Sequence, residues 1–368
     1  MPVSVEGVKR PIGRPRAKER PVNFQTVTLR AAAALALSSS AFFGAVPATA
    51  ATSATHRDIH STAYRVTRVV SLVGYTEAHA TGFGPSDSIA GDAVLNGARL
   101  CLLWSTTAVL NISPGGFSVC RVDAVSKSGT IVGRVGTGTK TQGFVYKDGR
   151  STVVPSAASF FAVNSAGLAL GVKQDGSRGV YDTVSDTWPV FQDLGRGCGI
   201  TRPIALNDHY VFGAATCADG SAKYGLADSG HYLSLSLPGD LRPSSILTSA
   251  DQLVLFDPRA AGHTYLWRVW GGRPPQDLGN VPNDVYGTYT PVAANPYGTV
   301  VGENRPQFFS WVRTPLDGTR DLGALILPGN FFGLSVADVD DAGNVLAQAF
   351  DFDTSGSQVW MILQPSSS

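Results

Sequence analysis

The chain has few charged side chains and lacks the common motifs of enzyme chemistry. Asp, Glu, Lys and Arg make up 15% of its 368 residues, whereas it contains 41 Gly and 22 Pro. No G-x-S-x-G, H-E-x-x-H or phosphate-binding glycine motif is present, and the six His are scattered along the chain. Low charge with many turn formers is typical of an all-β extracellular protein.

The first 50 residues have the pattern of a secretory signal peptide. A basic segment from Lys9 to Arg30 precedes an apolar run from Ala31 to Val46, and small residues end at Ala50. This run is shorter than the ~20 residues that span a membrane. We therefore expect cleavage after Ala50, a flexible lead-in over residues 51–64, secretion to the extracellular space and no stable membrane insertion.

Removal of this leader reverses the sign of the net charge. The whole chain carries +1, but residues 1–50 hold seven Lys or Arg and two Glu, which leaves 22 basic and 26 acidic residues. A nucleic-acid partner needs a basic surface. The sequence therefore predicts no nucleic-acid partner.

One turn phrase recurs along the rest of the chain. In residues 161–171, FAVNSAGLALG, Asn and Gly supply a tight turn between two short strands. Related segments lie at 86–91, 124–133, 205–213, 247–255, 293–302 and 337–347. The closing glycines are spaced by 42, 38 and 42 residues at Gly91, Gly133, Gly171 and Gly213. A period near 40 residues with four short strands predicts propeller blades.

Two further landmarks follow this turn in most repeats, whose four strands we name A to D. An apolar pair ending in an aromatic residue marks strand C, at Trp104, Tyr146, Tyr181, Trp267, Trp311 and Trp360. An Asp-Leu-Gly triplet follows strand D at 193–195, 277–279 and 321–323. Because the four Trp share the strand C position, we expect them to pack in the core and not to bind sugar.

The two ends of the exported chain predict a shared last blade. The strand at Arg65–Val73 has no repeat of its own, and the last repeat ends with strand C at Val359–Leu363. Pairing these two strands would complete the blade and remove an exposed edge. The sequence therefore predicts one all-β domain at residues 65–368, a seven-bladed β-propeller whose N-terminal strand completes the last blade.

Four cysteines in an exported chain predict two disulfides, with three connectivities open by count alone. Cys198 and Cys217 lie symmetrically about the turn at 207–208, so a hairpin would place them opposite each other. We favour this pair, which leaves Cys101 to pair with Cys120. No CxxC motif or neighbouring His supports a metal site at these residues.

Function is expected in the loops that connect the strands. In a propeller the D-to-A and B-to-C loops share one face, and we expect ligand-binding groups there at Arg202, Asp284, Tyr286, Glu303 and Arg305. Arg and Tyr combine a large contact area with directional hydrogen bonds. The alternative is that these are ordinary solvated loop residues. The A-to-B turns, including that of Lys127, are expected to be structural.

A second candidate site lies in the segment D-x-D-x-S-G. Asp351, Asp353 and Ser355 place alternate oxygens before a Gly, a spacing that can wrap Ca²⁺. Ile362 stands where a twelve-residue calcium loop requires Glu, so a simple Asp-rich turn is the alternative. No other cofactor is expected.

The repeat resembles the extracellular HAF-repeat family of bacterial secreted proteins. Residues 321–325 (DLGAL) and 295–302 (NPYGTVVG) match two parts of that family's pattern, and 308–311 (FFSW) matches its end loosely. The His-Ala-Phe triad itself is missing. The resemblance implies an exported, propeller-like repeat protein, and it transfers no catalytic residues.

Together these observations predict a secreted, monomeric, non-catalytic module that binds an extracellular glycan or protein. The alternative is a propeller hydrolase or lyase that acts on extracellular carbohydrate. Its acid and base would come from the loop carboxylates Asp257, Asp284, Glu303 and Asp351. Two carboxylates roughly 5 to 10 Å apart in a central cleft would favour this enzyme.

Overall fold

A computed structural model describes most of the predicted domain. The described residues are 61–72, 74–138, 140–190, 197–228, 231–257, 263–279, 289–304, 309–327, 331–351, 353 and 357–367. The chain divides into two units, Met1–Thr55 and His56–Ser368, and all of the described residues belong to the second. The predicted signal peptide at residues 1–50 lies outside the described residues.

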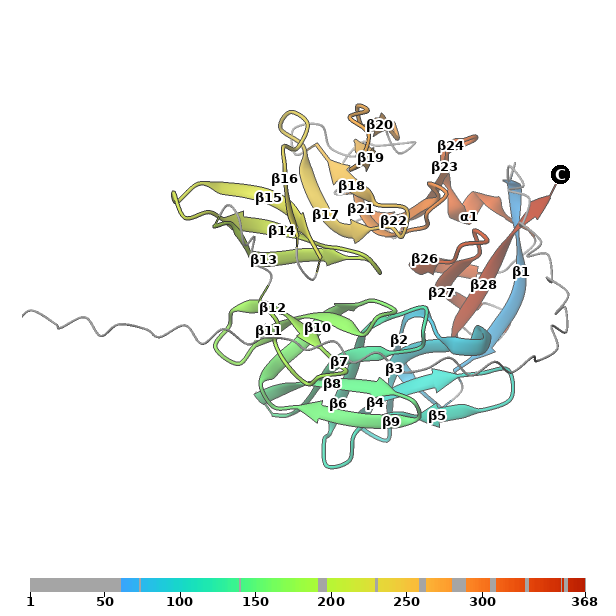
Figure 1. Cartoon of the computed structure of the whole chain (residues 1–368). Helices are drawn as coiled ribbons and strands as arrows, with labels where there is room; N and C mark the ends of the chain where they lie inside the picture. The colour runs from blue at the N-terminus through green and yellow to red at the C-terminus, as the bar shows by residue number, and fades with distance from the viewer. Residues whose placement is uncertain are drawn as a thin grey trace, which may run out of the picture. The chain divides into compact units, whose positions relative to one another are not determined.

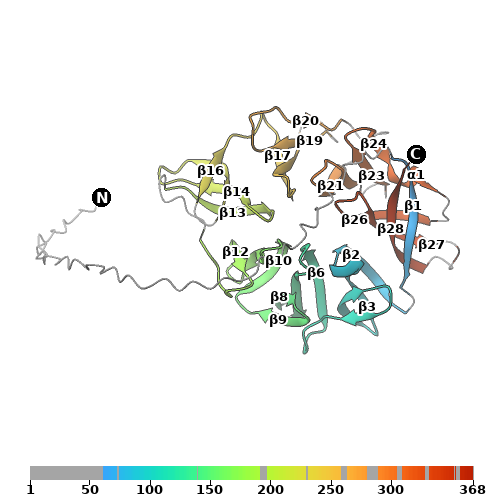
Figure 2. The same cartoon turned by 45° about the vertical axis from the view of Figure 1, so that its right-hand side comes forward.

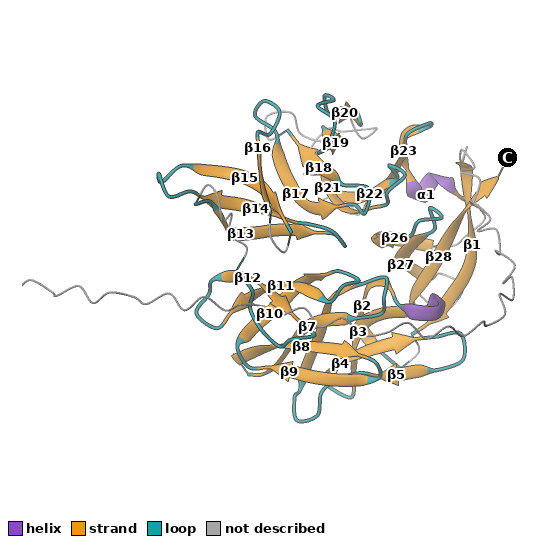
Figure 3. Cartoon of the chain, viewed as in Figure 1, coloured by secondary structure: helices purple, strands orange, loops and turns teal. Residues whose placement is uncertain are grey.

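Strands make up nearly all of the regular structure, as Figures 1 and 3 show. The helical elements of the described ranges are the short turn η1 (Pro85–Asp87) and the single-turn helix α1 (Leu322–Leu325). In these residues no helix is long and apolar enough to cross a membrane. The unit is therefore all-β, as the sequence predicts.

The first two repeats form one continuous hydrogen-bonded sheet. Its first half contains β2 (Thr76–Phe83), β3 (Ile89–Leu95), β4 (Ala98–Trp104) and β5 (Val109–Asn111). Its second half contains β6 (Val119–Val125), β7 (Ile131–Thr137), β8 (Lys140–Lys147) and β9 (Arg150–Val154). A parallel pairing of Arg99 with Val119 joins the halves. Each half is an antiparallel meander in chain order.

The middle repeats form separate antiparallel sheets in chain order. The first contains β10 (Ala157–Val163), β11 (Leu168–Lys173) and β12 (Arg178–Asp182). The next contains β13 (Gly199–Leu206), β14 (Val211–Thr216), β15 (Ala222–Ala227) and β16 (Tyr232–Leu235). The third contains β17 (Arg242–Leu247), β18 (Gln252–Phe256), β19 (Thr264–Arg268) and β20 (Gln276–Asp277). The fourth contains β21 (Tyr289–Ala294), β22 (Val300–Asn304), β23 (Phe309–Thr314) and β24 (Gly318–Asp321).

The last sheet combines both ends of the described chain. It has the order β25-β1-β28-β27-β26, built from β1 (Ser61–Ser71), β25 (Ile326–Leu327), β26 (Phe331–Val339), β27 (Val345–Asp351) and β28 (Ser357–Ser367). Strand β1 pairs antiparallel with β28 over Ser61–Ser71, so the predicted pairing of these two ends is present. Strand β1 begins earlier than the predicted Arg65, because Ser61 already pairs with Ser367.

This succession of antiparallel meanders is the arrangement of a β-propeller. Figure 2 shows the first strand of each repeat toward the middle of the described unit. These strands are β2, β6, β10, β13, β17, β21 and β26. Each contains at least one register shift against its neighbour. A bulge bends and twists the strand that carries it. The same register irregularity therefore occurs in the first strand of every repeat.

The closing glycines of the repeat are required by close packing. A Cβ atom on Gly91 would lie 2.1 Å from the His79 carbonyl oxygen and 2.6 Å from Trp360. A Cβ atom on Gly302 would lie 2.2 Å from the Trp311 ring. At Gly302 the glycine packs against the strand C aromatic residue of its own repeat, and at Gly91 it packs against that of the last repeat.

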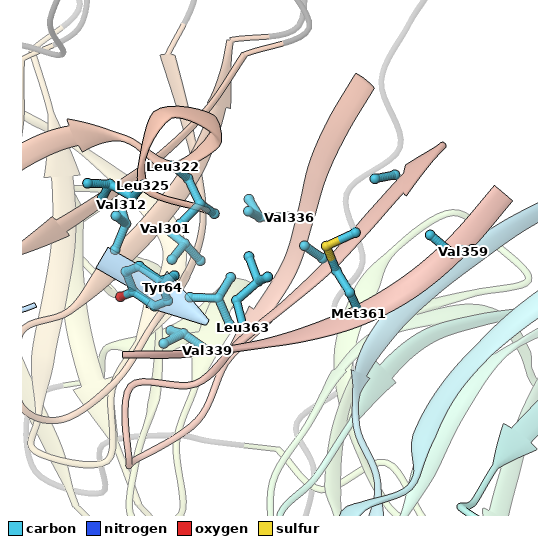
Figure 4. Close-up of a cluster of buried hydrophobic side chains, with 13 residues drawn as sticks. Tyr64, Val301, Val312, Leu322, Leu325, Val336, Val339, Val359, Met361 and Leu363 are labelled. Atoms are coloured by element: carbon cyan, nitrogen blue, oxygen red, sulfur yellow. The ribbon is translucent and has the colours of Figure 1, made fainter. Parts of the chain in front are cut away.

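The strand C tryptophans are buried, as predicted. Trp104, Trp311 and Trp360 are each at most 1% exposed, and Trp267 is also in the core. A second cluster surrounds Tyr64 of β1, which packs among residues of the last two sheets (Figure 4). Burial of a large apolar side chain stabilises a fold by about 1.5–3 kcal/mol. The N-terminal strand is thus part of the core and not of the flexible lead-in.

Candidate functional site

The A-to-B turns share one hydrogen-bonded geometry. In each described turn the first residue donates its backbone N–H to a carbonyl oxygen three or four positions later, at 2.8–3.0 Å. These first residues are Gly84, Ser126, Asn164, Asn207, Thr248, Asn295 and Asp340. Where the side chain is polar, it accepts a second backbone N–H, as Asn164 does from Leu168 at 2.8 Å. Asn, Asp, Ser and Thr favour such local turns.

Three of these turns also bond to the next turn around the unit. The Nδ2 atom of Asn164 donates to the Asn207 carbonyl oxygen at 2.8 Å, and that of Asn207 donates to the Thr248 carbonyl oxygen at 2.8 Å. Asn295 makes the same bond to Asp340 at 3.0 Å. The Asn side chain therefore holds two neighbouring repeats in register, a role that the sequence pattern alone did not show.

The turns surround a cavity of about 560 Å³, which we call the turn cavity. All seven repeats contribute one equivalent position to its lining, and six of them contribute a second. The last residue of strand A lines it at Phe83, Val125, Val163, Leu206, Leu247, Ala294 and Val339. The residue after the first turn position lines it at Lys127, Ser165, Asp208, Ser249, Pro296 and Asp341. We call the first set the apolar collar and the second set the rim.

The lining of the turn cavity is acidic. Asp208, Asp338, Asp340 and Asp341 contribute carboxylates, and Lys127 contributes an ammonium group. Lys127 pairs with Asp341, with Nζ 2.8 and 2.7 Å from the two carboxylate oxygens. Asp208 accepts the backbone N–H of Ser165 at 2.7 Å. A backbone donor orients a carboxylate without cancelling its charge, so the lining keeps a net negative charge.

Asp338 links the first and last repeats. Its Oδ2 atom accepts the backbone N–H of Phe83 at 3.1 Å, and its Oδ1 atom accepts that of Val339 at 2.8 Å. Burial raises the pKa of Asp338 to about 6, because desolvation of the charged form outweighs these two hydrogen bonds. At neutral pH the carboxylate is mainly ionised and adds to the charge of the cavity.

The predicted binding residues are spread over other parts of the unit. Arg202 lies in β13 with its side chain exposed. Glu303 lies near the far end of β22 from the A-to-B turn and accepts a hydrogen bond from the Ser335 hydroxyl. Asp284, Tyr286 and Arg305 lie outside the described residues. These residues stay a prediction, whereas the turn cavity lies among turns to which the sequence analysis assigned a structural role.

The predicted calcium segment is described in part. Asp351 accepts the backbone N–H of Asp353 at 2.9 Å, as in a local Asp turn, and Ser355 lies outside the described residues. Among the residues that the structure describes, no group of three His, Cys, Asp or Glu side chains is placed to hold a metal ion. Calcium binding at this segment stays a prediction.

A second charged cluster lies in the first two repeats, where the Asp92 and Asp123 carboxylates repel each other. The buried Arg99 donates to Asp92 at 2.6 Å and also pairs with Glu77. Nearby, Asp123 lies 3.8 Å from the Nε atom of Arg134, and burial raises the pKa of Asp123 to about 6. Burial also raises the pKa of Asp92. Removal of one partner from such a buried network leaves an uncompensated charge, so we assign this cluster a structural role.

Both disulfides have the predicted connectivity. Cys198 and Cys217 lie 3.9 Å apart between Cα atoms and join the ends of β13 and β14. Cys101 of β4 bonds to Cys120 of β6, so this bridge links two successive repeats. Disulfides form in oxidising compartments, and the two bridges fit such an environment.

Comparisons with known proteins give structural matches of low similarity. No family model and no curated protein matches the chain. The β-propeller domain of Cps50 (Swd1) from Myceliophteria thermophila shares 11% identity at a TM-score of 0.47, covering 82% of this chain and 100% of that domain. The WD40 repeats of RRP9 share 16% identity at 0.43, covering 82% and 99%. The fold assignment therefore rests on the strand pairings described above.

Proposed function

We propose that this chain is an exported, non-catalytic binding module that binds its partner at the turn cavity. The observation that carries the proposal is that corresponding positions of seven repeats line one concave space. Pockets of about 300–1,000 Å³ with an apolar lining and a few convergent polar groups are typical ligand sites. The turn cavity has this size and this division into an apolar collar and a polar rim.

We infer that the repeats close into a seven-bladed ring in which β1 completes the last blade. The antiparallel pairing of β1 with β28 supports this closure. Gln358 also exchanges two hydrogen bonds with the Ala78 backbone, at 3.0 and 2.7 Å, between the last and first repeats. The resemblance to HAF repeats is part of the same proposal, since it implies a repeat protein of this kind.

Export is supported by the leader pattern and by the two disulfides. The basic segment, apolar run and small residues before Ala51 form a cleavable signal. The bridges Cys101–Cys120 and Cys198–Cys217 need an oxidising compartment to form. We propose that the mature protein acts in the extracellular space.

Binding is favoured over carbohydrate cleavage because two of the described candidate carboxylates serve local structure. Glu303 accepts a hydrogen bond from Ser335 of the next sheet, and Asp351 accepts the backbone N–H of Asp353. Neither carboxylate lines the turn cavity. A general acid and base must instead face one substrate from opposite sides.

The proposal is tested by filling the mouth of the cavity. Purified residues 51–368 are applied to an array of random peptides and an array of extracellular glycans, together with Ser165→Trp and Ser249→Trp. Both substitutions place a large ring at the rim. Lys140→Trp is the control, because Lys140 is exposed at the turn between β7 and β8.

We expect peptide signals that fall at least about tenfold in both rim variants and persist in the Lys140 variant, since loss of a central contact costs ~1–2 kcal/mol or more. Binding that is the same in the wild type and both rim variants would show that the turn cavity is not the site.

A further inference from the structure

Resting on the proposed function, we propose that the turn cavity binds an apolar side chain from a peptide that carries Lys or Arg next to it. The apolar collar would hold the apolar side chain, and the acidic lining would pair with the cations beside it. The partner is thus a basic segment of another protein and not a neutral sugar or a phosphate.

The apolar collar supplies the first part of this recognition. All seven of its side chains are hydrocarbon, and five of them are half-buried although they end central strands of the unit. These five are Phe83, Val125, Val163, Leu206 and Ala294. Apolar surface at the centre of this fold remains exposed. A ligand that covers it would stabilise the complex by about 25 cal/mol per Å² of apolar surface buried. A sugar hydroxyl placed there would lose hydrogen bonds to water.

The charge of the lining supplies the second part. Four Asp and one Lys belong to the turn cavity, and Lys127 is already paired with Asp341. Asp208 is exposed and accepts a hydrogen bond from the neutral backbone N–H of Ser165. A phosphate or carboxylate ligand would be repelled by these groups, whereas Lys or Arg would be attracted. An apolar centre with a charged rim is also the usual anatomy of a protein interface.

The size of the cavity limits what enters it. A volume of about 560 Å³ accommodates a few side chains of an inserted loop or tail, and it is too small for a folded domain. The contact is therefore made by a short segment, and the exposed rim contacts the residues on either side of the inserted one.

The test uses three fluorescein-labelled nine-residue peptides and fluorescence anisotropy. The first has a central Leu between two Lys on each side, the second replaces Leu by Ser, and the third replaces every Lys by Glu. Binding is measured to residues 51–368 at about 0.05 and about 0.3 M salt, because screening weakens exposed charge pairs.

Two matched pairs of variants locate the contacts. Asp208→Lys reverses a charge at the rim, and Asp219→Lys makes the same change at the other end of β14. Both carboxylates are exposed and both accept one backbone N–H, at 2.7 and 2.8 Å. Val163→Thr adds a hydroxyl to the apolar collar, and Val172→Thr does so at the other end of the same sheet, where the valine is likewise half-buried.

We expect the Leu–Lys peptide to bind about tenfold or more tightly than the other two, and to weaken at the higher salt. Asp208→Lys and Val163→Thr should each weaken it severalfold, and their controls should not. Equal binding of the Glu peptide, or no binding of the Leu–Lys peptide at millimolar concentration, overturns the inference.

The two proposals fail in different ways. If array peptides of another class bind and are lost in Ser165→Trp, the turn cavity remains the site and the inference about basic peptides is wrong. If no bound peptide is affected by either rim variant, the proposed function is wrong as well.

Discussion

Trp104 and Trp360 meet edge to face, with ring centroids 4.1 Å apart and ring planes at 68°. The first belongs to strand C of the first repeat and the second to strand C of the last repeat, and both are fully buried. Such aromatic pairs contribute about 0.5–1.5 kcal/mol beyond the burial of their area. The two ends of the repeat array are therefore joined through their cores as well as through the pairing of β1 with β28.

Gly91→Ala should destabilise this junction. The added Cβ would lie 2.1 Å from the His79 carbonyl oxygen and 2.6 Å from the Trp360 ring, so strand β2 or the ring must move. We expect a loss of about 1–3 kcal/mol in the free energy of unfolding, measured by urea denaturation. Gly115→Ala is the control, because the space around Gly115 is open, and it should change stability by less than about 0.5 kcal/mol.

Asn207→Ala should weaken the contact between two repeats. Its Nδ2 atom donates to the Thr248 carbonyl oxygen and to Asp251, and its Oδ1 atom accepts the N–H of Tyr210. Loss of these buried bonds should cost about 1–3 kcal/mol. Asn111→Ala removes one exposed bond to Ser113 and serves as the control. Equal effects of the two substitutions in thermal unfolding would contradict this role.

Acidification from pH 7 to pH 5 should stabilise the fold through Asp338. Its pKa is raised from 3.8 to about 6, so between these values the folded state binds more protons than the unfolded state. The free energy of unfolding therefore falls as pH rises through this window. Asp338→Asn should reduce the slope of that part of the melting temperature profile, and the raised pKa of Asp123 keeps part of the slope. Asp219→Asn should leave it unchanged, because the pKa of Asp219 is lowered by hydrogen bonds from Ser221.

Reduction of the disulfides should lower stability without a change in strand order. Each bridge closes a loop with a sequence separation of 19, which contributes about 3 kcal/mol in the chain-entropy model. Cys198→Ser with Cys217→Ser, compared with Cys101→Ser with Cys120→Ser, would separate the two bridges in denaturant unfolding. A stability that is the same with and without reductant would contradict this contribution.

The exported protein should begin near Ala51. Mass spectrometry of secreted material should detect an N-terminal peptide that starts at this residue, because the small residues at 48 and 50 fit a signal cleavage site. Recovery of the chain with residues 1–50 still attached, in the membrane fraction, would refute export by this route.

The repeat made much of the fold predictable from the sequence, because several of its landmarks reflect packing constraints. Gly91 marks a close approach to Trp360, Trp104 packs against the same ring, and Cys198 and Cys217 flank a hairpin. The binding surface was harder to predict. The phrase around Asn164 has the composition of an ordinary turn, and its side-chain bond to Asn207 spans 43 residues. Such a contact depends on how repeats are placed, which local patterns do not specify.

At the turn cavity, the turn geometry is the same in every repeat, whereas the side chains of the rim differ from one repeat to the next. The first residue of each A-to-B turn keeps the same backbone hydrogen bond, whereas the next residue is Lys127, Ser165, Asp208, Ser249, Pro296 or Asp341. A substitution at this second position alters the chemistry of the mouth without breaking a strand or a turn. Binding preference in a chain built this way can therefore change one repeat at a time, while the strand pairing and the backbone hydrogen bonds of the turns are kept.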